Sequence, residues 1–325
     1  MTERVLYLGI DAGGTATRAA VAKADGRVLA SGRGGPSGST GGASARRLLR
    51  RALDSALAPL AAAIGAQPCV VHLGLRGLSI AGRSDAARAT LAERLPQARI
   101  AVGNDAAVAL EGALAGNEGV AVLAGTGSIA FARRADGIEA RSGGFGYLVG
   151  DEGSGFWLGR EAVAASLRSL DGRGAATALG ELLRSTLRLD SVGDLVAWVY
   201  AARHPAPRLA ELAPLVARAA NEGDVVAIDL LRLAGEALAE LGITAARRAF
   251  GEDSPRRLLV ARCGGVWSAG PMLIEPFEAA LHAALPTARS VPPRLPAVGG
   301  AILLAMAADH RRPTPEIIGG LRRSG

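Results

Sequence analysis

This chain contains the same short strand–turn–strand pattern twice, and the repeat restricts the folds that it can adopt. When the sequence is shifted by 111 positions, Gly14-Thr15 aligns with Gly125-Thr126 and Thr17 aligns with Ser128. In each copy an apolar strand leads into a Gly/Thr turn, and a second apolar strand follows. Such turns present backbone N–H groups and small hydroxyls to an anion. Two of them facing each other could hold a polyphosphate from both sides.

Length and composition favour a globular protein with two domains. At 325 residues the chain is longer than one hydrophobic core usually supports, so we expect two domains with a cleft between them. Aromatic residues make up only 3% of the chain, and its formal net charge is +7. Because the arginines are scattered and few aromatic side chains could stack on bases, we expect a solvated Arg-rich surface and no nucleic acid partner.

Cysteine usage and hydropathy favour a cytoplasmic protein. Cys69 and Cys263 are far apart and form no C-x-x-C motif, so neither a disulfide framework nor a zinc site is indicated. No signal-peptide region follows Met1, and no uninterrupted apolar run reaches the roughly 18 residues of a membrane span. We therefore expect a reducing compartment and no membrane partner.

Hydrophobic periodicity predicts an α/β fold with a mixed sheet covered by helices in the first half. The expected strands are 6–10, 18–22, 27–31, 70–75 and 100–102, and the expected helices are 43–64, 86–95 and 106–114. The second half is expected to contain a hairpin of strands 120–124 and 129–133, a mostly helical stretch 159–250, a strand 258–263 and helices 272–284 and 298–308. The tail from 311 to 325 is expected to be frayed.

The first repeat, Gly9–Arg18, reads G-I-D-A-G-G-T-A-T-R and contains the parts that phosphoryl transfer needs. The glycines would let backbone donors approach a phosphate, and the hydroxyls would add further bonds. Asp11 could hold Mg²⁺ through water, because Mg²⁺ prefers to retain several of its waters. The alternative is an ordinary Gly-rich hairpin. Because the turn recurs, we favour a nucleotide cradle, with the contacts Gly13, Gly14, Thr15, Thr17, Gly125, Thr126 and Gly127.

Asp105 lies between the end of a predicted strand and the start of a predicted helix, in the order Gly103-Asn104-Asp105. One interpretation is a helix N-cap, because Asp and Asn side chains accept hydrogen bonds from the first helical N–H groups. The other is a general base that accepts the proton of an attacking hydroxyl. Local sequence favours neither.

Two later segments are also candidates for ligand binding. The segment from Gly143 to Gly155 has six glycines together with Phe145, Asp151 and Glu152, and carboxylates in such a loop commonly bind sugar hydroxyls. The alternative is a solvated acidic turn. Gly264 and Gly265 follow a predicted strand and could flank an adenine or a ribose.

The five motifs together resemble the N-acetylglucosamine kinases, in the BadF/BadG-type ATPase group of the actin-like sugar kinase superfamily. The order and spacing match over nearly the whole chain. The residues that carry the resemblance are Asp11-Ala-Gly-Gly-Thr15, Gly103-Asn-Asp105, Ala124-Gly-Thr-Gly-Ser128, Gly150-Asp-Glu-Gly-Ser154 and Gly264-Gly-Val266.

The resemblance implies two actin-like (ribonuclease H-like) lobes, with ATP and Mg²⁺ in the cleft between them. The lobes would comprise residues 1–116 with 297–325 and residues 117–296, the second with a helical insertion. Asp105 would be the catalytic base. The amino sugar would lie against Asp105, Ser128, Ile129, Gly144, Phe145, Gly146 and Asp151.

The expected activity is therefore ATP-dependent phosphorylation of an amino sugar, with N-acetylglucosamine O6 as the favoured acceptor. A glucosamine kinase, an activator ATPase that acts on a partner protein and a catalytically silent sugar sensor are the alternatives, and a homodimer stays open. Two departures bear on the sugar: the segment 35–40 has no Asn where relatives commonly place one, and Phe145 stands where some relatives have Trp.

Overall fold

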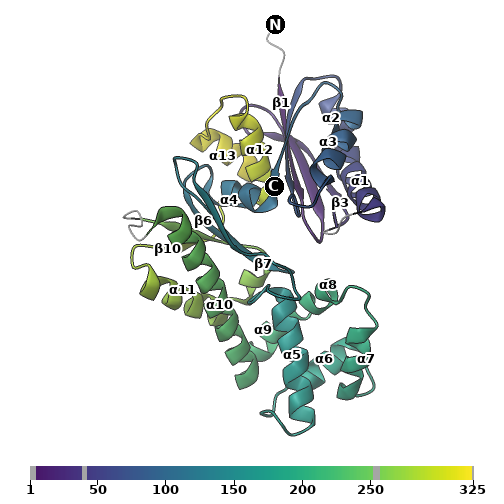
Figure 1. The fold of residues 1–325 in the computed structure, drawn as a ribbon, viewed down its shortest axis with the longest axis vertical. Coiled ribbons are helices and arrows are strands. Elements are labelled where there is room, and N and C mark those ends of the chain that lie inside the picture. Colours follow the sequence, from purple (N-terminus) through teal and green to yellow (C-terminus); the bar gives the residue numbers. More distant parts are fainter. Residues whose placement is uncertain (1–4, 39–41, 252–256, 324–325) are drawn as a thin grey trace. The chain divides into compact units, whose positions relative to one another are not determined.

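The computed structural model describes residues 5–38, 42–251 and 257–323. Contacts divide the chain into two compact units, which we call unit 1 (Met1–Glu118 and Pro292–Gly325) and unit 2 (Gly119–Val291). Each unit contains a five-stranded sheet of mixed direction with flanking helices, which confirms the predicted α/β class (Figure 1).

The unit 1 sheet has the strand order β3-β2-β1-β4-β5. Its strands are β1 (Leu6–Ala12), β2 (Thr17–Ala22), β3 (Val28–Gly34), β4 (Cys69–Leu75) and β5 (Arg99–Asn104). β1, β4 and β5 are parallel, whereas β2 pairs antiparallel with both β1 and β3. The carboxyl ends of β1, β4 and β5 therefore lie at one edge of the sheet, where loops carry the candidate site residues.

One face of this sheet is covered by α1 (Ala43–Leu57), α2 (Ala61–Ile64) and α3 (Arg83–Arg94) (Figure 1). Leu49 and Leu53 of α1 are buried with Ile10 of β1, as the helical spacing of apolar residues predicts. The single helix predicted for 43–64 is interrupted by a short 3₁₀ turn, Ala58–Leu60, because Pro59 has no N–H to continue the α-helical hydrogen bonds.

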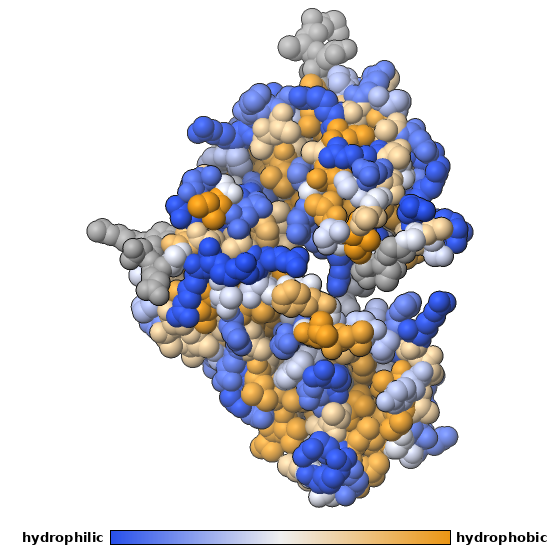
Figure 2. All heavy atoms as spheres, in the orientation of Figure 1, coloured by the Kyte–Doolittle hydropathy of each residue, from blue (hydrophilic) through white to orange (hydrophobic). Residues whose placement is uncertain are grey.

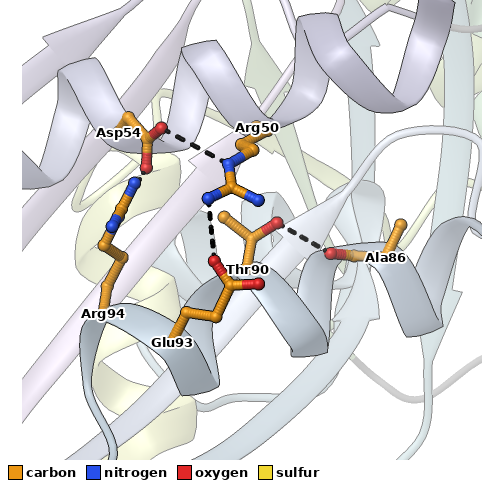
Figure 3. A network of polar contacts seen from close by, with 6 residues as sticks. All are labelled: Arg50, Asp54, Ala86, Thr90, Glu93 and Arg94. Carbon is orange, nitrogen blue, oxygen red and sulfur yellow. Dashed lines mark hydrogen bonds and ion pairs between the residues drawn. The ribbon is translucent and has the colours of Figure 1, made fainter. Parts of the chain in front are cut away.

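Ion pairs link α1 and α3 on the outside of unit 1 (Figure 3). Arg50 contacts Glu93 at 2.8 Å and Asp54 at 3.9 Å, and Arg94 contacts Asp54 at 2.9 Å. All four side chains are at least partly exposed, so solvent screens these ion pairs and each contributes little to stability. The apolar residues buried beneath the helices stabilise the packing more than these ion pairs do.

The opposite face of the sheet is covered by α4 (Asp105–Leu114), α12 (Ala297–Ala307) and α13 (Pro315–Arg323) (Figure 1). Glycines let α12 approach its neighbours closely. A Cβ added at Gly300 would lie 2.1 Å from the Val108 carbonyl of α4, and one added at Gly9 would lie 2.5 Å from the Val298 carbonyl. α12 therefore packs directly against both α4 and β1, and this contact positions the start of α4.

The expectation of a frayed tail is wrong for the described part of it. Residues 315–323 form α13, and Ile317, Ile318 and Leu321 are buried with Tyr7 and Ile302. The three apolar residues lie on one side of α13. Their burial adds this helix to the layer that covers the second face of the sheet.

The unit 2 sheet repeats the same arrangement with the order β10-β9-β6-β7-β8. Its strands are β6 (Gly119–Ala124), β7 (Ser128–Arg133), β8 (Glu139–Gly143), β9 (Leu259–Cys263) and β10 (Arg289–Val291). β6, β9 and β10 are parallel, and β7 pairs antiparallel with β6 and β8. β8 and β10 are short, carry several polar residues and were not predicted.

Unit 2 is largely helical beyond its sheet, as the sequence predicts. α10 (Val225–Phe250) lies along β6, β7 and β8, and α11 (Pro271–Ala284) packs against it. The remaining helices are α5 (Gly155–Leu170), α6 (Leu179–Leu187), α7 (Leu195–Tyr200), α8 (Pro205–Ala210) and α9 (Ala213–Asn221), with 3₁₀ turns at Val192–Asp194 and Gly265–Ala269.

The visible surface of each unit mixes hydrophilic groups with apolar areas (Figure 2). Hydrophilic residues occur in scattered groups, in agreement with the dispersed arginines of the sequence. Over the described ranges, no helix combines the length and the apolar character that a membrane span requires.

Gly300→Ala should destabilise unit 1, because the new Cβ would meet backbone atoms of α4 that cannot move independently. We expect a loss of about 1–3 kcal/mol in the free energy of unfolding, measured by denaturant titration. Gly319→Ala in α13 is the matched control, since its nearest neighbour is the flexible end of Arg323 at 3.5 Å. The control should be neutral or gain up to about 1 kcal/mol. Equal effects of the two changes would contradict the proposed close contact.

Candidate functional site

The first glycine turn joins β1 to β2 and spans residues 13–16. It is closed by a hydrogen bond from the Gly13 N–H to the Ala16 carbonyl, at 3.1 Å. Thr15 is exposed at its tip, whereas Thr17 is fully buried at the start of β2. The Thr17 Oγ1 atom has no hydrogen-bond partner among the described residues. Thr15 is therefore placed to meet a ligand, and a ligand contact to Thr17 would require its hydroxyl to become accessible.

Two carboxylates meet at the carboxyl edge of the unit 1 sheet. Asp11 lies near the end of β1, and Asp105 is the first residue of α4, directly after β5. Strand register aligns Asp11 with Gly74 of β4 and Gly74 with Gly103 of β5. Neither glycine has a side chain, so Val108 of α4 packs closely over Gly74 and the His72 ring packs over Gly103.

The N-cap of α4 is Asn104 rather than Asp105. The Asn104 side chain accepts a hydrogen bond from the Ala106 N–H at 2.8 Å, and Asp105 Oδ1 makes a longer contact to the same N–H at 3.1 Å. The role of helix N-cap, one of the two interpretations of Asp105, therefore belongs to Asn104. Most of the hydrogen-bonding capacity of the Asp105 carboxylate is left for another partner.

Burial raises the pKa values of both carboxylates, and the charge of Asp105 adds to the rise at Asp11. Burial raises the pKa of Asp105, while the positive charge of Arg76 and the Ala106 N–H oppose the rise. Burial and the neighbouring Asp105 charge raise the pKa of Asp11 to about 6, and Arg18 opposes them. Two carboxylates in such an environment can share a cation or accept a proton.

The sequence analysis missed three residues that shape this site: Ser37, Arg76 and Arg83. Arg83 is almost fully buried and donates to the Ser37 carbonyl at 2.8 Å and the Gly38 carbonyl at 2.6 Å. Its Nε donates to the Arg76 carbonyl at 2.8 Å. Ser37 Oγ in turn donates to the Gly13 carbonyl at 2.9 Å. The network ties the loop after β3 and the loop after β4 to the first glycine turn.

No local signal marked Ser37 or Arg83, because both act through contacts distant in sequence. Arg76 had one usable signal: it directly follows a predicted strand at the same edge as Asp11 and Asp105. Its guanidinium contacts Gly14, since an added Cβ there would lie 2.5 Å from Arg76 Nη1.

The second glycine turn joins β6 to β7 and is anchored by Asp151. The Asp151 carboxylate accepts a hydrogen bond from the Ser128 N–H at 3.1 Å, and it lies so close to Gly127 that an added Cβ would be 2.7 Å away. Asp151 itself has a φ of 64°, a left-handed conformation that is uncommon for a residue with a side chain. Ser128 Oγ donates to the Glu152 carbonyl at 2.7 Å.

The start of α5 also docks on this turn. The Gly155 N–H donates to the Gly125 carbonyl at 2.8 Å, and the Phe156 N–H donates to the Thr126 carbonyl at 3.3 Å. The Gly125 and Thr126 carbonyls thus accept hydrogen bonds within unit 2. Contacts with the start of α5 and with Asp151 together hold the turn in place.

The glycine-rich loop between β8 and Asp151 contacts the start of β7. Gly144 donates its N–H to the Ser128 carbonyl at 3.1 Å, and its Cα packs so closely on Ile129 that a Cβ would lie 2.7 Å from the Ile129 side chain. Gly144 and Gly146 have φ angles of 72° and 89°, which explains glycine at both positions. Phe145 between them is 66% exposed, with Arg141 over its ring at 5.9 Å.

Gly264 and Gly265 complete the group in unit 2. An added Cβ at Gly264 would lie 2.3 Å from the Ala124 carbonyl, at the base of the second turn, whereas the space beside Gly265 is open.

Unit 1 therefore gathers Asp11, Gly13, Gly14, Thr15 and Asp105 at one sheet edge. Unit 2 gathers Gly125, Thr126, Gly127, Ser128, Ile129, Gly144, Asp151 and Gly264 at the corresponding edge of its own sheet. Each edge can bind an anion through a glycine turn, and unit 1 adds the carboxylates.

Residues 8–305 match the model of the BadF/BadG/BcrA/BcrD ATPase family, which covers most of the chain. The chain belongs to this ATPase family. Membership confirms the resemblance drawn from the five motifs and supports ATP as the nucleotide.

The relatives of this family member that we compare cover between 70% and 93% of the chain. An N-acetylmuramic acid/N-acetylglucosamine kinase from Clostridium acetobutylicum is 29% identical over 92% of the chain and 97% of the relative. The glucosamine kinase GspK of Vibrio cholerae is 30% identical over 70% of the chain and 75% of the relative. The solved structure of a candidate N-acetylglucosamine kinase from Chromobacterium violaceum is 33% identical, with a TM-score of 0.72 over 93% of the chain and 99% of that structure. These likenesses confirm the predicted actin-like fold class.

Asp11→Asn should change how the stability of this family member depends on pH. Folding raises the pKa of Asp11 from 3.8 to about 6, so its stabilising contribution is complete below the lower value and is lost as the pH rises through the higher one. A neutral Asn should therefore raise the free energy of unfolding by about 1–3 kcal/mol at about pH 7.5, and by little at about pH 4. Denaturant titrations at the two pH values measure the difference, and a gain that is independent of pH would contradict the assignment.

Asp151→Ala should destabilise unit 2 by about 1–3 kcal/mol, because it leaves the buried Ser128 N–H without its acceptor. Asp151→Asn is the matched control: it keeps an oxygen acceptor and tolerates the positive φ. Chemical denaturation should therefore rank Asn well above Ala. If the two variants were equally stable, the hydrogen bond to Ser128 would not be the anchor of the turn.

Proposed function

We propose that this chain is an ATP-dependent kinase of amino sugars, with O6 of N-acetylglucosamine as the favoured acceptor. The observation that carries the proposal is the place of Asp105. Its carboxylate stands beside a phosphate-binding type of turn, and Asn104 relieves it of the N-cap role. The kinase relatives named above support the amino sugar as the substrate class.

In the proposed reaction, Asp105 accepts the proton of the sugar hydroxyl as that oxygen attacks the γ-phosphorus of ATP. A bond forms between the sugar oxygen and phosphorus, the bond from phosphorus to the bridging β-phosphate oxygen breaks, and ADP leaves. A carboxylate whose pKa is raised by burial is a better proton acceptor than a solvated one. The first turn, with Gly13, Gly14 and Thr15, would contribute N–H and hydroxyl donors to the phosphates, and the turn of unit 2 would contribute its own.

Asp11 fits the magnesium ion that accompanies ATP. Mg²⁺ is commonly held by one or two carboxylates together with phosphate oxygens and waters, so a single Asp beside a phosphate turn suffices. Bound there, the ion would neutralise phosphate charge. The residues described by the structure contain no group of three or more acidic, histidine or cysteine side chains that would form a complete protein cage.

The segment 144–151 stays the proposed sugar contact in unit 2. Gly144 packs on Ile129, the space beside Gly146 is open, and Phe145 offers an exposed ring that can cover an apolar sugar face. Ser128 and Asp151 are buried and hold the turn, so any contact of theirs with the sugar would add to that structural task.

The activator ATPase alternative receives no support from the cysteines. Iron–sulfur ligation requires thiolates, yet burial raises the pKa of both Cys69 and Cys263 to about 12. We also propose a cytoplasmic location, which suits two unpaired thiols.

Asp105→Asn should lower kcat for sugar phosphorylation by about 10²–10⁴-fold, because the variant has no general base. The measurement is coupled ADP release with and without N-acetylglucosamine, glucosamine, N-acetylmuramic acid and glucose. Asp85→Asn on the exposed part of α3 is the control and should keep full activity.

The same assay separates the alternatives. Turnover that depends on an amino sugar supports the kinase, turnover without sugar supports an activator ATPase, and the absence of turnover supports a sensor. Near-normal kcat in Asp105→Asn would refute the assignment of the base.

A further inference from the structure

Arg76 places a guanidinium group over the first glycine turn without a partner for its charge. The group contacts Gly14, where an added Cβ would lie 2.5 Å from Nη1. The side chain is half-buried, and among the described residues it forms neither an ion pair within 4.0 Å nor a side-chain hydrogen bond. A partly buried guanidinium with open donors is costly to fold unless an anion completes the site.

Hydrogen bonds fix the backbone of Arg76, and this holds the base of its side chain beside the first glycine turn. Its N–H donates to the Ala12 carbonyl at 3.2 Å, and its carbonyl accepts from Arg83 Nε at 2.8 Å. Arg76 directly follows β4, the strand between β1 and β5. Its strand therefore lies between β1, which carries Asp11, and β5, which Asp105 directly follows.

The neighbouring charges leave Arg76 as the cation that is free to bind a ligand. Arg83 is committed to backbone carbonyls and to Ser37, as described above. Arg18 lies across the hairpin from Asp11 and lowers its pKa. Arg76 also attracts Asp105, but no contact short enough for an ion pair joins them among the described residues.

We propose that Arg76 binds the phosphoryl group that is transferred, donating from its guanidinium to oxygens of the γ-phosphate while the glycine turn binds the same phosphate chain. The inference rests on the proposed kinase function and extends it to one residue. A planar guanidinium donates two parallel hydrogen bonds to phosphate oxygens and brings a full positive charge, which a backbone turn does not carry. Because charge redistributes over these oxygens during transfer, the contact would stabilise the transition state more than the ground state.

The binding test compares a nonhydrolysable ATP analogue with ADP by isothermal titration calorimetry in the presence of Mg²⁺. Arg76→Ala should weaken the analogue by about tenfold to a hundredfold, the range for a charged hydrogen bond, and leave ADP affinity unchanged. Equal losses for both nucleotides, or no loss for either, would overturn the inference.

The kinetic test uses the full chain with ATP and the best sugar of the panel. Arg76→Ala should lower kcat by about 10²-fold or more with a small change in the sugar KM, and Arg76→Lys should recover only part of it. Arg51→Ala on the exposed side of α1 removes one arginine charge elsewhere and should have no effect. A loss confined to the KM of an acidic sugar such as N-acetylmuramic acid would overturn the inference, because it would mean that Arg76 binds a sugar carboxylate.

A pH profile separates a phosphate contact from an indirect effect on the base. Removing the Arg76 charge raises the pKa of Asp105. If Arg76 acted only in this way, kcat of Arg76→Ala would recover fully at higher pH, and that recovery would overturn the inference. A kcat that stays low across the plateau supports it.

Circular dichroism and thermal unfolding verify that the variant is folded. Failure of the proposed function is recognised separately, because the unmodified chain would then show no sugar-dependent turnover at all.

Discussion

Each glycine turn of this protein is held in shape by a polar side chain from elsewhere in its own unit. A turn made of glycine and small residues has almost no side-chain contacts, so its backbone would lose much entropy on ordering without an external anchor. In unit 1 the anchor is Ser37, which is itself fixed by the buried Arg83. In unit 2 it is Asp151, which accepts from the Ser128 N–H. The remaining donors of each turn can then face a ligand without a further ordering cost at binding.

The two anchors differ in charge: Ser37 is neutral and Asp151 carries a carboxylate. This difference matches the charges of the residues near each turn. A neutral hydroxyl near the first turn adds no negative charge where Asp11 and Asp105 already repel each other. The second turn has no such pair, and the carboxylate beside it accepts a hydrogen bond from the Ser128 N–H. Arginines compensate the charge in unit 1, with Arg18 beside Asp11 and Arg76 near Asp105. The site therefore combines carboxylates whose pKa values are raised by burial with arginines whose charge opposes that rise.

The sequence predicted the local features of the fold and missed those that depend on distant contacts. The repeat, the glycine turns and the amphipathic α1 have patterns confined to a few neighbouring residues, so they could be identified directly. β10 is three residues long, and its identity as a strand comes from pairing with β9. α13 looked frayed because its apolar residues find their partners, such as Tyr7, about three hundred positions earlier. The same holds for Arg83, whose role depends on a loop in a different part of unit 1.

The structure also shows how the two copies of the hairpin diverge. In unit 1 the last strand pair is Ala12 with Thr17, whereas in unit 2 it is Ala124 with Ser128, so the second turn is one residue shorter. The next pair inward is Asp11 with Arg18 in unit 1, and two apolar residues, Leu123 with Ile129, in unit 2. Charge that could act on a phosphate or on Mg²⁺ thus belongs to only one hairpin. The apolar pair of the other hairpin packs against the glycine-rich loop instead, through Ile129. The two copies of the turn therefore differ in chemistry: the first has a charged edge suited to reaction with a phosphate, and the second has an apolar edge suited to positioning a loop.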